Sequence, residues 1–171
     1  MSSFIIFIFS CCAFAFIAAY YLSKQVMSIK ITGTENEISR FHKISGAIED
    51  GAKAFLRAEY YYVALFCLCF SVLVFLALSA GTGSYQVGIY SAIAFLLGAL
   101  ISTIAAFLGM IIATKGNIRT TVQARKSLSQ AFKVAYNSGA VMGFGLCGLA
   151  VFGLTVICLW YSNLVSDIHL V

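Results

Sequence analysis

Four long apolar runs limit how this chain can fold more than any other feature. The only charged side chain among them is Glu59, at the edge of the second run. A helix needs about 20 apolar residues to cross the hydrocarbon core of a bilayer. We therefore predict an all-α integral membrane protein whose residues 1–171 form one membrane region. The predicted transmembrane helices cover about residues 3–23, 58–80, 87–113 and 139–162.

Composition excludes several other classes of protein. Hydrophobic residues make up 61% of the chain and charged residues 10%, against about 25% charged residues in soluble domains. A soluble enzyme, a secreted disulfide scaffold and a disordered chain are therefore disfavoured. The apolar runs lack the alternation of a membrane β-barrel. The first run has no basic residues before it and is too long for a typical signal peptide, so we expect a retained helix.

The distribution of charge predicts the orientation in the membrane. All eleven Lys and Arg residues lie in two segments, about residues 24–57 and 114–138. Because basic loops stay on the cytoplasmic side, we expect both segments to be cytoplasmic loops and both termini to lie on the opposite side. The net charge of +5 then reflects topology, and we expect no nucleic-acid partner.

Both predicted loops show helical patterns. Apolar residues between 38 and 56 recur at helical spacing, which predicts an amphipathic helix from about Glu37 into the second span. Gly33 and Thr34 fall in the turn before it. Glu49 and Lys53 are four residues apart, a spacing that favours an ion pair on one helix face.

The second loop carries polar residues at steps of three and four, which predicts that they line one face of a helix. One interpretation is a helical extension of the third and fourth spans that meets anionic lipid headgroups. The other is a surface that faces an anionic substrate such as a phosphate compound. The residues in this polar stripe are Arg119, Gln123, Lys126, Gln130 and Lys133.

Small residues are concentrated in the third and fourth spans. Gly139 and Gly143 form a GxxxG motif in the fourth. Small side chains let helices approach closely inside a bilayer, so we expect tight packing against other helices, including helices outside this chain. The small residues of the third span are Gly98, Ser102, Ala105, Ala106 and Gly109.

No catalytic, cofactor-binding or metal-binding residue is predicted. The GxGxxG pattern of residues 143–148 lies inside a span and follows no strand, so it does not indicate a dinucleotide site. The six cysteines include no CxxC pair and are expected to pack as small hydrophobic residues. Glu49 and Asp50 are adjacent, so on a helix they point in different directions and suit a solvated face.

The two histidines and Glu59 are the remaining candidate functional residues. His42 lies in a polar loop and His169 follows Asp167 in the tail, and neither completes a nucleophile–base arrangement. An acid at membrane depth is a functional candidate by default. Glu59 is expected at the interface, near Arg57 and next to three tyrosines.

Two stretches resemble the membrane-bound, ion-pumping pyrophosphatases. Residues 50–60, DGAKAFLRAEY, are similar to the family segment EGAxAFLxREY that leads into its second span. Residues 95–143 resemble the third span, cytoplasmic loop and fourth span, including the family's ANVRTA-like and GAVMG-like pieces. The chain departs from the family pattern at Asp50, Ala58 and Gly116.

The resemblance implies a part of a larger pump. Members of the family are several times longer, work as homodimers, and use Mg²⁺ to hydrolyse pyrophosphate while moving H⁺ or Na⁺ outward. Their Asp- and Lys-rich motifs do not occur in this sequence. The chain would thus be the N-terminal four-span portion, without catalytic residues or Mg²⁺ ligands. Its implied partners are the lipid bilayer, the remaining helices of the pump and a second copy of it.

Other hypotheses remain open at this point. The chain could be a free-standing four-span scaffold or assembly protein, or one subunit of a split pump. It could also be a gene remnant without function. An unrelated small channel is disfavoured because no polar set of pore-lining residues is visible. In each case we expect a multi-pass membrane protein, and the bacterial cell membrane is the predicted location.

Overall fold

The computed structural model describes residues 2–168, with side chains described for residues 3–162. The regular secondary structure of this part of the chain is entirely helical, with four helices that are each long and apolar enough to cross a membrane. For the described residues, the prediction of an all-α fold with four helices able to span a membrane is therefore confirmed. The helices are α1 (Ser2–Met27), α2 (Glu35–Thr82), α3 (Tyr85–Ala124) and α4 (Leu128–Ile168).

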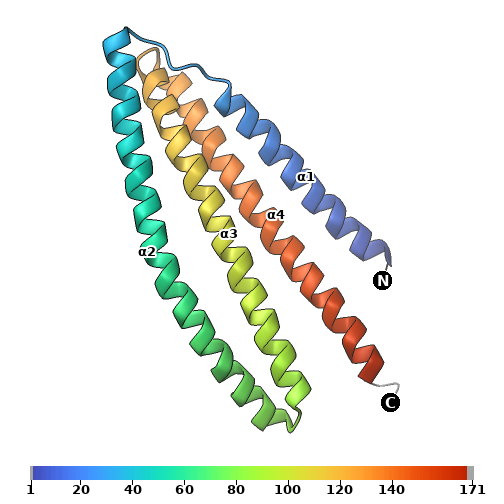
Figure 1. Cartoon of the computed structure of the whole chain (residues 1–171). Coiled ribbons are helices and arrows are strands. Elements are labelled where there is room, and N and C mark those ends of the chain that lie inside the picture. The colour runs from blue at the N-terminus through green and yellow to red at the C-terminus, as the bar shows by residue number, and fades with distance from the viewer. Residues whose placement is uncertain (1, 169–171) are drawn as a thin grey trace.

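The four helices form a single row instead of a closed bundle. Helix α3 packs against α2 on one side and α4 on the other, and α4 also packs against α1 (Figure 1). Among the described residues α2 touches neither α1 nor α4, and α1 meets α3 over a short stretch only. The row α2–α3–α4–α1 is thus one helix thick.

Successive helices run in opposite directions, which brings both loops to one end of the molecule. The α1–α2 loop, residues 28–34, lies beside the α3–α4 turn, residues 125–127, at the top of Figure 1. The α2–α3 turn lies at the far end, on the same side as the N-terminus and the end of α4. We call the first of these the loop end of the molecule.

Three helices are much longer than a membrane is thick. Helix α2 has 48 residues, α3 has 40 and α4 has 41, so at about 1.5 Å per residue they reach about 72, 60 and 62 Å. The hydrocarbon core is only about 30 Å thick. The charged parts of these helices, at the loop end, therefore extend beyond that thickness, as the amphipathic pattern before the second span predicts.

The first turn of α2 is fixed by its own sequence. Thr34 is the N-cap, in an extended backbone conformation. The backbone N–H of Thr34 donates a hydrogen bond of 2.9 Å to Oε2 of Glu37. This is the return half of a capping box, in which the third residue of the helix satisfies an amide at its start. The predicted turn at Gly33 and Thr34 is confirmed.

The predicted polar stripe across residues 119–133 is wrong as a single helical face. The chain reverses direction at residues 125–127, so Arg119 and Gln123 lie on α3 while Gln130 and Lys133 lie on α4. The physical cause is local: Oγ of Ser127 accepts a hydrogen bond of 3.2 Å from the backbone N–H of Gln130. A serine at this position begins a new helix instead of continuing the old one.

Aromatic side chains gather at the end of the molecule opposite the loops. The ring of Tyr90 packs edge-on against the rings of Trp160 and Tyr161, with centroids 5.8 and 6.2 Å apart. The hydroxyls of Ser91 and Tyr161 are 3.3 Å apart. Tyrosine and tryptophan favour the membrane–water interface, so this cluster suits the interface on that side.

Glycines allow the closest approaches between helices. A Cβ built on Gly88 of α3 would lie 2.7 Å from the backbone oxygen of Phe75 and still closer to Oγ of Ser79, both on α2. Gly116 of α3 meets Ser138 of α4 in the same way. The glycine Gly98, also on α3, has nothing within 4 Å of its built Cβ. Only some of the predicted small residues therefore serve contacts within this chain.

This difference predicts that Gly88→Ala and Gly98→Ala have opposite effects. Adding a methyl group at Gly88 forces α2 and α3 apart and should cost about 1–3 kcal/mol of stability, as overpacking does. The same change at Gly98 should be neutral, or stabilise by up to about 1 kcal/mol through helix propensity. Denaturant unfolding of the solubilised chain, followed by circular dichroism, measures both. Equal stabilities of the two variants would contradict the packing described.

Candidate functional site at the loop end

Most charged side chains of the described residues lie on the parts of the helices nearest the loop end, which makes it the candidate functional site. It is built from the first half of α2, the second half of α3, the start of α4 and the end of α1, which lie side by side there (Figure 1). Three arrangements of charged side chains define its geometry: a link between the loops, an arginine at the end of α1, and an ion pair on α2.

Glu37 and Arg125 link the two loops. Nη2 of Arg125 lies 2.8 Å from Oε1 of Glu37, whose second oxygen accepts the Thr34 amide. The guanidinium of Arg125 also lies 5.8 Å from the centre of the Phe41 ring. The hydrogen bond from Arg125, followed by those from Thr34, lowers the pKa of Glu37 from 4.5 to about 2. Glu37 therefore stays charged at any physiological pH.

Arg119 joins α3 to the end of α1. Its Nη1 donates a hydrogen bond of 2.7 Å to the backbone oxygen of Lys115, and its Nη2 lies 3.5 Å from the backbone oxygen of Met27. Met27 is the last residue of α1. A positive charge is favourable there because the last carbonyls of a helix carry partial negative charge. Beside this contact Val26 and Val122 are almost fully buried.

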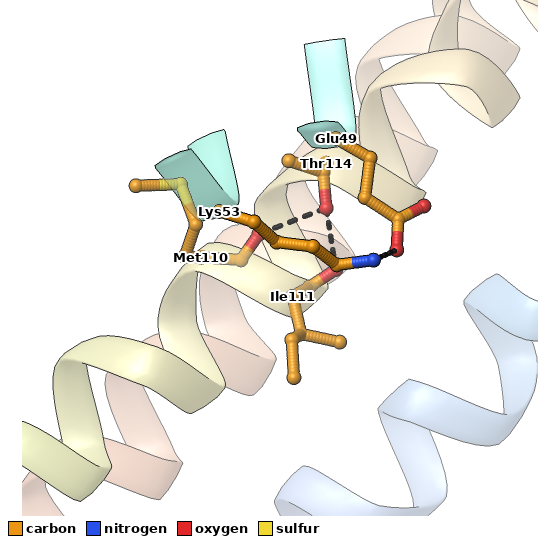
Figure 2. Close-up of polar contacts among 5 residues, drawn as sticks. All are labelled: Glu49, Lys53, Met110, Ile111 and Thr114. Atoms are coloured by element: carbon orange, nitrogen blue, oxygen red, sulfur yellow. Dashed lines mark hydrogen bonds and ion pairs between the residues drawn. The ribbon is translucent and has the colours of Figure 1, made fainter. Parts of the chain in front are cut away.

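The predicted pair of Glu49 and Lys53 is confirmed. Their side chains lie 2.8 Å apart on α2, and this hydrogen-bonded charge lowers the pKa of Glu49. Figure 2 shows the pair beside Thr114 of α3, whose hydroxyl donates to the backbone oxygens of Met110 and Ile111 at 3.0 and 3.1 Å. Asp50, next to Glu49, is exposed, as expected for a solvated helix face.

A cavity of about 490 Å³ opens between α3 and α4 near these groups. Its polar lining comes from hydroxyl and amide side chains, and no charged residue is among those that line it. Such a lining can hydrogen-bond a neutral polar group but offers no general base and no cation for a phosphate. The polar lining residues are Thr114, Asn117, Thr120 and Ser138.

The described residues do not fit a magnesium site. Mg²⁺ prefers carboxylate oxygens, and within the described part of the chain no three His, Cys, Asp or Glu side chains lie together. Two of the carboxylates, Glu37 and Glu49, are already paired with basic side chains. His169 and the side chain of Asp167 lie outside the described residues.

Glu59 lies away from this cluster, on the exposed part of α2 beside α3. The hydroxyl of its neighbour Tyr60 donates a hydrogen bond of 2.9 Å to the backbone oxygen of Thr103. Glu59 stands out in the sequence, whereas the contacts of Arg119 and Arg125 become visible only in the structure. The capping-box spacing of Thr34 and Glu37 could have placed Glu37 at a helix start, whereas no local signal pairs it with a residue 88 positions away.

The link between the loops predicts an unusual titration of Glu37. In the intact chain its carboxyl should titrate at about pH 2, and in Arg125→Ala its pKa should rise toward the ordinary value. Because the pKa is lowered on folding, the link stabilises fully above pH 4.5 and is lost as pH falls through about 2. A ¹³C NMR titration of the side-chain carboxyl measures this. A midpoint unaffected by Arg125→Ala would rule out the link.

Comparison with known proteins places this sequence in a family. The profile described as "Inorganic H+ pyrophosphatase" matches residues 13–171. The chain is 38% identical over 143 residues to a putative K(+)-stimulated pyrophosphate-energized sodium pump of Clostridium tetani, an alignment that covers 84% of this chain and 19% of that protein.

Two further relatives are named as proton pumps. Pyrophosphate-energized membrane proton pump 3 of Arabidopsis thaliana is 32% identical over 166 residues, or 91% of this chain and 20% of that protein. A K(+)-insensitive pyrophosphate-energized proton pump of Caldanaerobacter subterraneus is 32% identical over 77% of this chain and 19% of its own length. The chain thus spans about one fifth of the length of these relatives and belongs to the inorganic H⁺ pyrophosphatase family.

Proposed function

We propose that these 171 residues are the N-terminal four-span part of a pump that hydrolyses pyrophosphate and moves H⁺ or Na⁺ across the membrane. The observation that carries this proposal is the family match over residues 13–171. The relatives it matches are named as pyrophosphate-energised pumps, and the chain covers about one fifth of each. Because these names include both a sodium pump and proton pumps, both ions remain part of the proposal.

Within the pump, this part would supply helix packing and not catalysis. A path for ions needs ionisable residues inside the membrane, and Glu59 is the one charged residue within the four predicted spans. In the proposal, pyrophosphate and Mg²⁺ are bound by the remainder of the pump, where the metal would neutralise phosphate charge and activate water. The loop-end carboxylates Glu37 and Glu49 support this division, since both are paired with basic side chains.

We further propose that the loop end is cytoplasmic and that both termini lie on the opposite side. The arrangement of the helices supports this orientation, because the two basic segments meet at one end of the row (Figure 1). A homodimer is proposed for the complete pump. The relatives from Clostridium and Caldanaerobacter support the bacterial cell membrane as the location, and the relative from Arabidopsis makes a plant membrane the competing choice.

The size and activity of the native protein test the function. An antibody against residues 116–136 should detect a band several times larger than 18.5 kDa in membranes of the source cells. Removing that band with the antibody should remove Mg²⁺-dependent pyrophosphate hydrolysis from the solubilised membranes. The purified 171-residue chain should hydrolyse no pyrophosphate, because the described residues contain no metal-binding group of three ligands.

Other outcomes of this experiment would redirect the proposal. A band near 18.5 kDa that co-purifies with a second chain and with hydrolysis would indicate a split pump. The same band without hydrolysis would indicate a scaffold protein. Hydrolysis by the isolated chain would contradict the structural role.

The proposed orientation predicts which turns can be labelled from outside. Ser84→Cys, in the α2–α3 turn, should react with a membrane-impermeant maleimide applied to intact cells. Ser127→Cys, in the α3–α4 turn, should react only after the membrane is opened. Both serines lie in short turns between helices. A difference in labelling between the two variants therefore reports the side of the membrane and not whether the residue lies in a helix or a turn. The natural cysteines are measured in the unmodified chain as background, and the reverse labelling pattern would invert the orientation.

A further inference from the structure

A groove runs between α2 and α3 on one side of the helix row. Its volume is about 620 Å³, and it lies within the apolar part of both helices. Its lining combines one carboxylate, three hydroxyl groups and small side chains with the larger apolar side chains of Val63, Phe66 and Phe95. The lining residues used below are Glu59, Tyr60, Gly98, Ser102, Thr103 and Ala106.

The two exposed sides of α3 differ in kind. Large apolar side chains, including Leu100 and Ile104, are exposed on one side, with 56% and 45% of their surfaces accessible. Gly98, Ser102 and Ala106 follow at steps of four and are exposed as well. Ser102 is two residues from both Leu100 and Ile104, so it lies roughly 160° around the helix from each. The small residues therefore occupy the opposite side, which forms the groove.

A helix face that contacts only lipid does not need small residues. Lipid tails pack against Leu and Ile side chains as well as against small ones, whereas small side chains allow the backbone of a second helix to come close. A Cβ built on Gly98 meets nothing within 4 Å, so no helix of the described chain uses this space. The groove can therefore accommodate a helix that does not belong to residues 1–171.

Glu59 gives the groove a negative charge that has no basic partner within the described residues. The ion pairs in the described part of the chain are Glu37–Arg125 and Glu49–Lys53, and Glu59 takes part in neither. The adjacent Tyr60 hydroxyl donates its hydrogen bond to the backbone oxygen of Thr103 and not to Glu59. A carboxylate at the edge of a span is costly next to hydrocarbon unless a cation or hydrogen-bond donor meets it. Lipid tails in the groove would leave it unmatched.

We propose that the groove between α2 and α3 seats a transmembrane helix from outside residues 1–171, and that this helix presents a basic side chain to Glu59. The inference rests on the proposed function, because it takes the helix from the remainder of the pump. The charge of Glu59 sets the chemistry of the partner, and the small residues set the close approach. Lipid and a second copy of this chain are the competing occupants.

Site-specific photocrosslinking in the full-length pump tests which occupant is present. A benzophenone amino acid is placed at Ser102 in the groove, and at Leu100 on the opposite side as the matched control. After irradiation of native membranes, the crosslinked peptides are identified by mass spectrometry. Ser102 should crosslink to a transmembrane peptide outside residues 1–171, and Leu100 should crosslink mainly to lipid. Crosslinks from Ser102 to lipid alone, or to residues 1–171 of a second copy, would overturn the proposal.

Substitution of Glu59 tests the charge. Glu59→Ala should lower the polypeptide crosslink at Ser102 by at least about fivefold, as expected when one member of a desolvated charge pair is removed. Glu59→Gln keeps the shape and one set of hydrogen bonds, and should fall in between. Asp50→Asn removes an exposed acid of the same helix and should leave the crosslink unchanged. A crosslink that survives Glu59→Ala at full yield would show that Glu59 does not recognise the partner.

The outcomes separate this inference from the proposed function. If the native band is large and hydrolyses pyrophosphate while Ser102 crosslinks only to lipid, the function stands and the docking site fails. If the band is near 18.5 kDa and Ser102 crosslinks to a different chain that carries a basic transmembrane helix, the site stands and the single-chain pump fails. The membrane level of each variant is measured with the antibody, so that a variant that fails to fold is not read as a loss of docking; Glu59→Gln then provides the charge test.

Discussion

The structure depends on one requirement, that every backbone amide in the hydrocarbon core must find a hydrogen-bond partner within the chain. Four apolar runs that lack the alternation of a β-barrel can meet that requirement only as helices. Once a helix is established it continues until a local signal stops it. Helix α2 begins at its capping residues Thr34 and Glu37 and continues to Gly83, which adopts a left-handed conformation with φ of 68°. The helices therefore extend far beyond the membrane and carry the charged residues with them.

A row that is one helix thick hides little of its own surface. Of the residues in the most apolar 18-residue stretch of each helix, only 6% are buried in α2 and 22% in α4, so few side chains fix the order of the helices. Contact depends on local fits, such as Gly88 against Phe75 and Gly116 against Ser138. At the loop end, where water screens charge, ion pairs add specificity more than energy.

Sequence reasoning succeeded where a signal is local and failed where it depends on packing. The spans, the start of α2 and the Glu49–Lys53 pair follow from runs and spacings within a few residues. The stripe from Arg119 to Lys133 failed because helical periodicity cannot detect a reversal of the chain, and the capping serine Ser127 was overlooked. The bond between Glu37 and Arg125 joins residues 88 positions apart, and it becomes visible only when both loops are placed at one end.

The distribution of acids then bears on how this part could work within a pump. The described acids at the loop end are either paired with bases, as Glu37 and Glu49 are, or exposed to solvent, as Asp50 is. Pairing makes such groups poor at attracting a metal, because the neighbouring cation already supplies the positive charge. Glu59 differs because it lies at the edge of the predicted second span, beside small residues of α3. It takes part in neither ion pair of the described residues, so under our proposal its counter-charge comes from a helix outside this row.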